Sequence, residues 1–426
     1  MASGPHPKRP SSVLPRRFIL LVGLALIIQV GFDVVFVASA PPPAIDDGRD
    51  LLAFFTAGQI AADESLGPKY VYNPELQRRL QEDLTGLTIA PGRGLPFIHP
   101  PYLLPVQRAL APLDYAEFWL RWSAIMVCLF LAGFAILDSG LVRAGTSPSL
   151  RLAFVAAGLA FRPVIISLVQ GQDTAFLYFG VAGWMAAFAA RRDILAGLIL
   201  SLATIRPHIA LVLALPFLFA RRRVLVGFII GSALLFGWFL AQVGTGGLLD
   251  YGRTMLGLVA GSESGVGVQD RVNLLGIFER SFPESVGQVS RFLGWGLWLG
   301  MTAGLCVLWD RRGRNGGPNL VDLGIAVVLA VAFAPHMNYH DLALIHAAAA
   351  PALVVSSKRC RDASGWSVIA SLVGISLVIS LALVSGFPVH DLLLAACYGI
   401  ALVMLTSAWG RGAANQGDSI GDRNIA

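Results

Sequence analysis

The sequence predicts an all-α integral membrane protein, a polytopic helical bundle of about 12 transmembrane segments with interfacial helices in its first outer loop. Hydrophobic residues make up 55% of the chain and charged residues only 14%, whereas a soluble domain has about 25% charged residues. Apolar runs that approach the roughly 20 residues needed to cross a bilayer recur from Phe18 to Trp409. Basic residues gather in alternate connections, which is typical of loops that face the cytoplasm.

The apolar runs define the membrane segments that we expect. In chain order they are Phe18–Ala38, Tyr115–Leu137, Leu150–Leu168, Thr174–Ala190, Ile194–Thr204, His208–Ala220, Val224–Val243, Phe292–Trp309, Leu320–Ala334, Leu342–Val355, Trp366–Val384 and Leu392–Ala408. The fifth and sixth runs are each too short to span alone, so they form either one kinked helix or two short ones. Arginines at both outer ends of this pair, 191–192 and 221–223, favour a turn near Arg206.

One transmembrane domain, residues 18–409, is expected between a basic cytoplasmic tail (1–17) and a disordered cytoplasmic tail (410–426). Two long outer loops, 39–114 and 244–290, belong to this domain. The first loop is predicted to begin with a helix at Asp50–Ala62, whose apolar side lies in the membrane interface. A second helix is expected from Asn73, as its cap, to about Asp83, and the prolines of Pro96–Tyr102 predict a rigid segment after it.

The first apolar run ends in Ala38-Ser39-Ala40, which is similar to a signal-peptidase site. We interpret the run as a retained anchor, because it is longer than the roughly 7–15 apolar residues of a signal sequence and Pro41 follows it. The formal charge of +6 reflects cytoplasmic loops, so nucleic acid is not an expected partner. The four cysteines are scattered and indicate neither a metal motif nor a disulfide framework.

Three carboxylates follow directly after the first membrane segment: Asp46, Asp47 and Asp50. A carboxylate held at the membrane surface can accept a proton from a hydroxyl group, which is the role of a general base. Asp50 is the leading candidate because it begins the predicted helix, and the other two are backups. The alternative for Asp50 is a helix cap, since aspartate at that position satisfies free backbone amides; the two roles are compatible.

Arg206-Pro207-His208 interrupts an apolar region on the predicted outer side. A charged residue there is costly in lipid and usually functional, and an arginine can hold a phosphate through paired donors, with His208 adding another. The alternative is an arginine that extends its charged end to the bilayer edge.

A second polar group is the turn Pro335–Asp341, which contains His336, Tyr339 and His340. The two histidines have helical i, i+4 spacing, but the glutamate that a metalloprotease helix requires and a nearby cysteine are missing, so we expect contacts to a polar substrate or phosphate and no metal. An ordinary polar turn is the alternative.

The turn at 170–173 offers Gln172 and Asp173, whose amide and carboxylate can bind hydroxyl groups, although a tight glycine turn explains the same residues. Arg162 lies about two helical turns inside an apolar run and therefore needs a partner, and the nearest acid in sequence is Asp173. We group Gln172, Asp173, Tyr339, His99 and Arg162 as expected sugar or acceptor contacts.

The order and spacing of several short motifs resemble glycosyltransferase family 87, whose members include polyprenyl-phosphate-mannose-dependent α-mannosyltransferases of the GT-C superfamily. The motifs are Asp50–Gly58, Val71–Pro74, Phe97–Pro101, Gly171-Gln172, Ala196–Leu198, Arg206–His208 and Pro335-His336. The similarity extends over residues 46–346. The family more often has tyrosine where this chain has His99 and lysine where it has Arg206, so the resemblance leaves the sugar and the acceptor open.

The resemblance implies a GT-C-type bundle in the plasma (inner) membrane, with both termini cytoplasmic and the active site on the outer, periplasmic face. It implies transfer of mannose or another sugar from a polyprenyl-phosphate donor to a lipid or glycan acceptor of the cell envelope, with inversion, and no further cofactor. Asp50 would be the base. Arg206, His208, His336 and His340 would stabilise the charge of the leaving phosphate.

A transporter or flippase for a polyprenyl-linked saccharide is the rival hypothesis, because it would share the lipid and phosphate sites. A transporter binds its substrate near the membrane midplane, whereas the polar motifs here collect on one side, which favours the enzyme. A non-catalytic membrane scaffold is the third possibility, and the arginines inside apolar regions argue against it.

Overall fold

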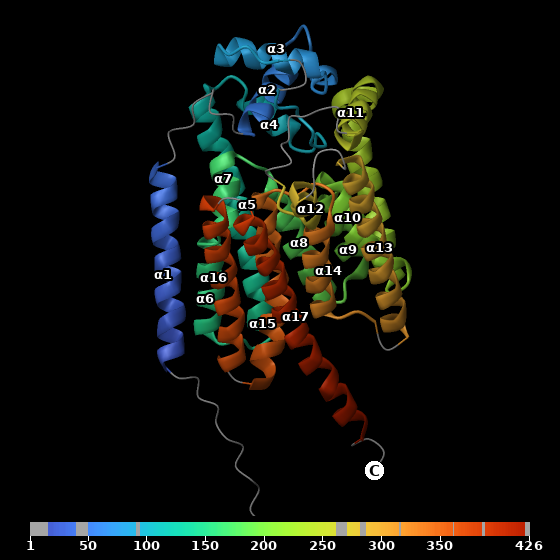
Figure 1. Ribbon diagram of the computed structural model, residues 1–426. Coiled ribbons are helices and arrows are strands. Elements are labelled where there is room, and N and C mark those ends of the chain that lie inside the picture. Colours follow the sequence, from blue (N-terminus) through green and yellow to red (C-terminus); the bar gives the residue numbers. More distant parts are fainter. Residues whose placement is uncertain are drawn as a thin grey trace, which may run out of the picture.

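The computed structural model describes residues 16–39, 50–90, 94–260, 271–281, 287–314, 317–360, 362–385 and 388–421. Asp46 and Asp47 lie outside the described residues. The elements are all helical (Figure 1) and run as follows: α1 (Arg16–Ser39), α2 (Leu51–Ala62), η1 (Pro68–Tyr70), α3 (Pro74–Thr85), α4 (Leu104–Leu110), α5 (Tyr115–Arg143), α6 (Pro148–Leu159), α7 (Arg162–Gln170), α8 (Thr174–Ala189), α9 (Asp193–Leu200), η2 (Ser201–Ile205), α10 (Pro207–Ala214), η3 (Leu215–Leu218), α11 (Arg222–Ala260), α12 (Leu274–Ser281), α13 (Gly287–Gly313), α14 (Leu320–Phe333), η6 (Tyr339–Ala343), α15 (Leu344–Cys360), α16 (Asp362–Val384) and α17 (Val389–Gly421).

The predicted polytopic helical bundle is confirmed, and each predicted apolar run is helical. Within the described ranges, seven helices are long and apolar enough to cross a membrane, and shorter apolar helices complete the bundle. One predicted run, Leu150–Leu168, is divided into α6 and α7 at Phe161. At the C-terminus, α17 continues to Gly421, through residues for which the sequence predicts a disordered tail.

The two short runs around Arg206 form two separate helical segments and not one kinked helix. Helix α9 with η2 ends at Ile205, and α10 begins at Pro207. Asp193 at the start of α9 forms an ion pair with Arg221, which follows η3, so both outer ends of the pair lie together. The chain therefore turns at Arg206, as the arginine clusters predict.

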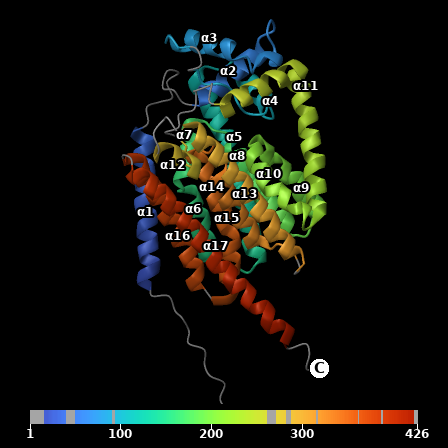
Figure 2. The same cartoon turned by 45° about the vertical axis from the view of Figure 1, so that its right-hand side comes forward.

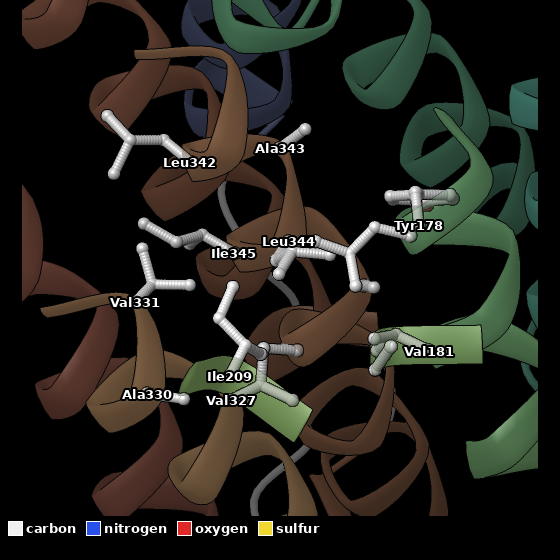
Figure 3. Close-up of a cluster of buried hydrophobic side chains, with 14 of the residues drawn as sticks. Tyr178, Val181, Ile209, Val327, Ala330, Val331, Leu342, Ala343, Leu344 and Ile345 are labelled. Atoms are coloured by element: carbon white, nitrogen blue, oxygen red, sulfur yellow. The ribbon is translucent and has the colours of Figure 1, made fainter. Parts of the chain in front are cut away.

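The centre of the bundle is a continuous apolar core between α8, α10, α14 and α15. Figure 3 shows Val181 of α8, Ile209 of α10, Val327 of α14 and Leu344 of α15 pointing into one cluster, and all four side chains are fully buried. Burial of this kind fixes the helix ends relative to one another. The loops at one end of the bundle, residues 170–173, Arg206 and 335–341, are thereby held together; we call this end the site end.

Helices α2, α3 and α4 form a layer over the site end (Figure 1). The predicted helix at 51–62 is confirmed, and all of α2 except Gln59 and Ala62 is buried within the protein. Its place in the membrane interface stays a prediction. The second helix is confirmed with its cap: the Asn73 side chain accepts a hydrogen bond from the backbone N–H of Leu76 at 2.9 Å.

The proline segment after α3 is held by glutamines of that helix. The Gln77 side chain accepts from the backbone N–H of Phe97 at 2.6 Å, and Gln81 accepts from that of Leu95 at 2.9 Å. Tyr72 donates its hydroxyl proton to the carbonyl of His99 at 2.7 Å. These contacts place the His99 side chain against the site end.

Helix α11 bends sharply at Gly244, where φ is +68°. This left-handed conformation suits glycine and ends the first helical half. Figure 2 shows the second half, residues 245–260, directed across the site end toward the α2–α4 layer. Part of the predicted outer loop 244–290 is therefore helical.

Arg162 has a partner far away in the sequence. Its guanidinium lies 3.0 Å from a carboxylate oxygen of Asp33 in α1, and its Nε donates to the Ser380 hydroxyl of α16 at 3.0 Å. Asp33 and Arg162 are both buried between α1, α7 and α16. Asp173, the nearest acid in sequence, is therefore not the partner of Arg162, and this pair instead attaches α1 to the bundle.

Candidate active site

Asp50 stands immediately before α2, but its side chain does not cap that helix. Its backbone has φ −57° and ψ −21°, whereas a capping residue usually has an extended backbone that turns the side chain back to the helix amides. The carboxylate accepts a hydrogen bond from Nε2 of Gln172 instead. Asp50 is half-buried, and its carboxylate is held in place by this contact.

The turn 170–173 joins the parts of the site. Oε1 of Gln170 accepts from Nδ1 of His340 at 3.1 Å, and the Gly171 carbonyl accepts from the indole N–H of Trp122 at 2.8 Å. Gln172 binds Asp50, and Asp173 lies beside Arg206. Four consecutive residues thus contact four different segments of the chain, and small displacements of this turn would move Asp50.

Arg206 lies between two carboxylates. Its Nη2 is 3.1 Å from Oδ1 of Asp173, and its Nε is 3.5 Å from Oδ1 of Asp341. All three residues are buried. The sequence predicts that Arg206 binds a phosphate. In the structure its partners are the carboxylates of Asp173 and Asp341, so the guanidinium compensates two buried negative charges.

His99 is the third contact of Arg206. One nitrogen, Nδ1 of His99, lies 2.7 Å from Nη1 of Arg206 and 2.8 Å from Oδ2 of Asp173. A ring nitrogen cannot accept from arginine and donate to carboxylate at the same time, so the tautomer of His99 decides which contact is a hydrogen bond. Either way, His99 joins the α2–α4 layer to the bundle.

The electrostatics keep both carboxylates of this cluster ionised. Burial raises the pKa of Asp173, but the charges of His99 and Arg206 outweigh it and lower that pKa below its ordinary value. The pKa of Asp341 is lowered for the same reason, against burial, by His340 and Arg206. Burial lowers the pKa of His340 in turn.

His208 and His336 lie next to each other near Arg206. Burial, followed by the charge of Arg271 and by His208, lowers the pKa of His336 to about 3, so this imidazole is neutral. Nε2 of His208 is buried and has no hydrogen-bond partner among the described residues. A buried polar atom of this kind is costly unless a ligand or water satisfies it.

Tyr339 and Arg162 are placed away from this cluster by their contacts. The Tyr339 hydroxyl bonds to Nε2 of His390, and His390 contacts Asp391 at 3.0 Å. Arg162 pairs with Asp33. Of the residues expected as sugar or acceptor contacts, the structure therefore brings together Gln172, Asp173 and His99. Within the described ranges, no group of three or more His, Cys, Asp or Glu side chains is arranged to hold a metal ion.

Sequence reasoning missed three tyrosines around the cluster. Tyr102 bonds to the Thr204 hydroxyl at 2.9 Å, two residues before Arg206. Tyr72 supports His99, and Tyr251 packs against Tyr72 with ring centroids 5.1 Å apart. Tyr72 and Tyr102 stand within the motifs Val71–Pro74 and Pro96–Tyr102, whereas nothing in the local sequence marks Tyr251.

Gly171→Ala should lower the rate of the reaction at this site strongly. Gly171 has φ +70°, and a Cβ there would lie 2.5 Å from Cδ1 and 2.9 Å from Cβ of Leu51, the residue next to Asp50. Gly145→Ala is the matched control, because Gly145 has φ +76° but nothing within 4 Å of the added Cβ. Both variants should lose about 1–2 kcal/mol of stability from backbone strain, and only Gly171→Ala should also lose activity. Equal activity of the two variants would show that the turn does not position Asp50.

A comparison with protein families identifies a match for this chain. The model of glycosyltransferase family 87 matches residues 97–335, more than half of the chain. The matched region contains His99, Gln172, Asp173 and Arg206; Asp50 precedes it, and it ends just before His336. A search of curated proteins found no match.

Proposed function

We propose, because this chain belongs to glycosyltransferase family 87, that it transfers a sugar from a polyprenyl-phosphate donor to a hydroxyl group of a lipid or glycan acceptor. Membership of the family and the membrane-spanning bundle establish a membrane glycosyltransferase. The donor type, the acceptor and the stereochemistry belong to the proposal.

The observation that carries the proposal is the set of contacts that the Asp50 carboxylate makes. Its carboxylate does not cap α2 and is held by Gln172. In the proposed step, Asp50 takes the proton of the acceptor hydroxyl while the acceptor oxygen bonds to the anomeric carbon. The bond from that carbon to the phosphate oxygen breaks, and the polyprenyl phosphate leaves with the electron pair. Attack from the face opposite the phosphate inverts the configuration.

The leaving phosphate needs charge stabilisation more than a proton. His208 supports this role, since its buried Nε2 has no partner among the described residues. The His208 side chain also hydrogen-bonds the backbone of His336, so the neutral ring can donate to a phosphate oxygen through Nε2 only in the tautomer that gives up that bond. The other residues that the sequence predicts to contact the phosphate are Arg206, His336 and His340. A phosphate bound at Arg206 would share the guanidinium with Asp173 and Asp341.

The location of the reaction is part of the same proposal. The α2–α4 layer and the polar turns share the site end, which in the predicted topology faces outward from the plasma membrane. A polyprenyl chain would lie among the apolar helices, and mannose is the sugar that the family resemblance favours.

The test is incubation of the purified protein with a panel of polyprenyl-phosphate sugars and candidate acceptors. We expect one donor to lose its sugar, with polyprenyl phosphate as the second product and an inverted linkage in the glycoside. Absence of release from every donor would contradict the proposal. Movement of an intact donor across liposomes, without release, would instead support the flippase hypothesis.

A further inference from the structure

The bend in α11 brings a tyrosine from a predicted loop to the edge of the Arg206 cluster. Residues 245–260 pack beside η1, where a Cβ on Gly247 would lie 3.2 Å from the carbonyl of Lys69. Figure 2 shows this half of α11 reaching the α2–α4 layer. Tyr251 lies in the middle of this half and is half-buried.

The ring of Tyr251 is held by aromatic neighbours. It meets the ring of Tyr72 edge-on, with centroids 5.1 Å apart, and the ring of Phe239 at 5.3 Å. Tyr72 is itself buried and bonded to the carbonyl of His99, whose side chain contacts Arg206. Edge-on aromatic pairs add stability to their buried area, so the Tyr251 side chain has a defined position beside the cluster.

The hydroxyl of Tyr251 has no hydrogen bond to the described residues, although it interacts electrostatically with Tyr102 and Arg206. The hydroxyl of Tyr102 uses its own proton in a hydrogen bond to Thr204. The Thr204 hydroxyl donates to the Ser201 carbonyl at 2.6 Å, so Tyr102 must be the donor to Thr204. The hydroxyl of Tyr251 therefore remains able both to donate and to accept.

The charge of the neighbourhood indicates what such a hydroxyl binds. Arg206, the charged group that interacts with Tyr251, already pairs with Asp173 and Asp341, so its charge is compensated before a ligand binds. A neutral group that can donate and accept, such as a sugar hydroxyl, matches the tyrosine hydroxyl.

We propose that Tyr251 is a specificity-determining residue whose hydroxyl binds one hydroxyl group of the transferred sugar or of the sugar acceptor. This inference rests on the proposed function, because it takes sugars as the substrates of the site. It predicts that one position of one sugar, and not the polyprenyl phosphate, is recognised by the second half of α11.

The test compares Tyr251→Phe with Tyr70→Phe, an exposed tyrosine of the neighbouring η1. Binding is measured by calorimetry without turnover, using short-chain polyprenyl-phosphate mannose and its monodeoxy forms as donor probes. Methyl α-mannoside and its monodeoxy forms serve as acceptor probes. We expect Tyr251→Phe to weaken binding of the parent sugar by about tenfold, as for loss of one hydrogen bond. That loss should vanish for one monodeoxy form, whereas Tyr70→Phe should bind like the wild type.

The outcomes separate this inference from the proposed function. An equal loss on every monodeoxy form, or an unchanged affinity of Tyr251→Phe, overturns the role of Tyr251. A wild-type protein that binds the donor but never transfers its sugar contradicts the proposed function alone. Failure of the wild type to bind any probe counts against both. A response confined to donor or to acceptor probes identifies which sugar Tyr251 contacts.

Discussion

Asp50→Asn should reduce the rate of sugar transfer at saturating substrate by about 10²–10⁴, the usual contribution of a general base. The amide cannot take the proton of the acceptor hydroxyl. Its oxygen can still accept the hydrogen bond from Gln172 that holds Asp50, and no capping bond of α2 is lost. The fold should therefore survive, which a thermal unfolding curve and size-exclusion chromatography would show alongside the rate.

Asp63→Asn is the matched control, because Asp63 is an exposed carboxylate at the other end of α2. Its rate should stay near that of the wild type. If Asp50→Asn also transferred sugar at the wild-type rate, Asp50 would not be the base. The same substitution at Asp46 and Asp47 would then test the two backup carboxylates.

Arg206→Ala should lower the stability of the protein by about 3–5 kcal/mol, the usual cost of removing one partner from a buried ion pair. It leaves Asp173 and Asp341 buried without their common counter-charge. A lower midpoint of thermal unfolding in detergent would measure this loss. Adding Asp341→Asn should recover part of it, because one of the two uncompensated charges is then removed.

The same variant separates two roles of Arg206. If the guanidinium only held the donor phosphate, Arg206→Ala would unfold at the wild-type temperature and would show a weaker affinity for the donor alone. An unchanged unfolding temperature would thus refute the compensating role described above. Arg79→Ala, which removes an exposed pair with Glu75, should leave both stability and donor affinity unchanged.

Much of the site is visible in the sequence because lipid penalises polar groups. Arg206, His340 and Asp173 each interrupt or border an apolar run, and such residues persist where they have partners or a function. The arginines at both ends of the short helices likewise predict the turn at Arg206, which the ion pair between Asp193 and Arg221 confirms.

The partners of these residues are harder to predict than the residues. Gln172 and Asp50 are 122 positions apart, so no local pattern records that the amide holds the carboxylate. The helix cap, which was the alternative for Asp50, is absent because the backbone before α2 is helical and not extended. The burial of nearly all of α2 is not visible in its sequence, because it depends on the packing of α3 and α4 against that helix. Each of these features depends on packing between distant segments.

The pair between Asp33 and Arg162 has a consequence for how the protein is assembled. The two residues lie about 130 positions apart, so at roughly 5–20 residues per second Arg162 is made several seconds or more after Asp33. During that interval Asp33 has a hydrogen bond from Gln29 of its own helix but no counter-charge, and an uncompensated carboxylate in lipid is costly. Helix α1 therefore cannot complete its polar contacts before α7 supplies Arg162 and α16, which is made later still, supplies Ser380.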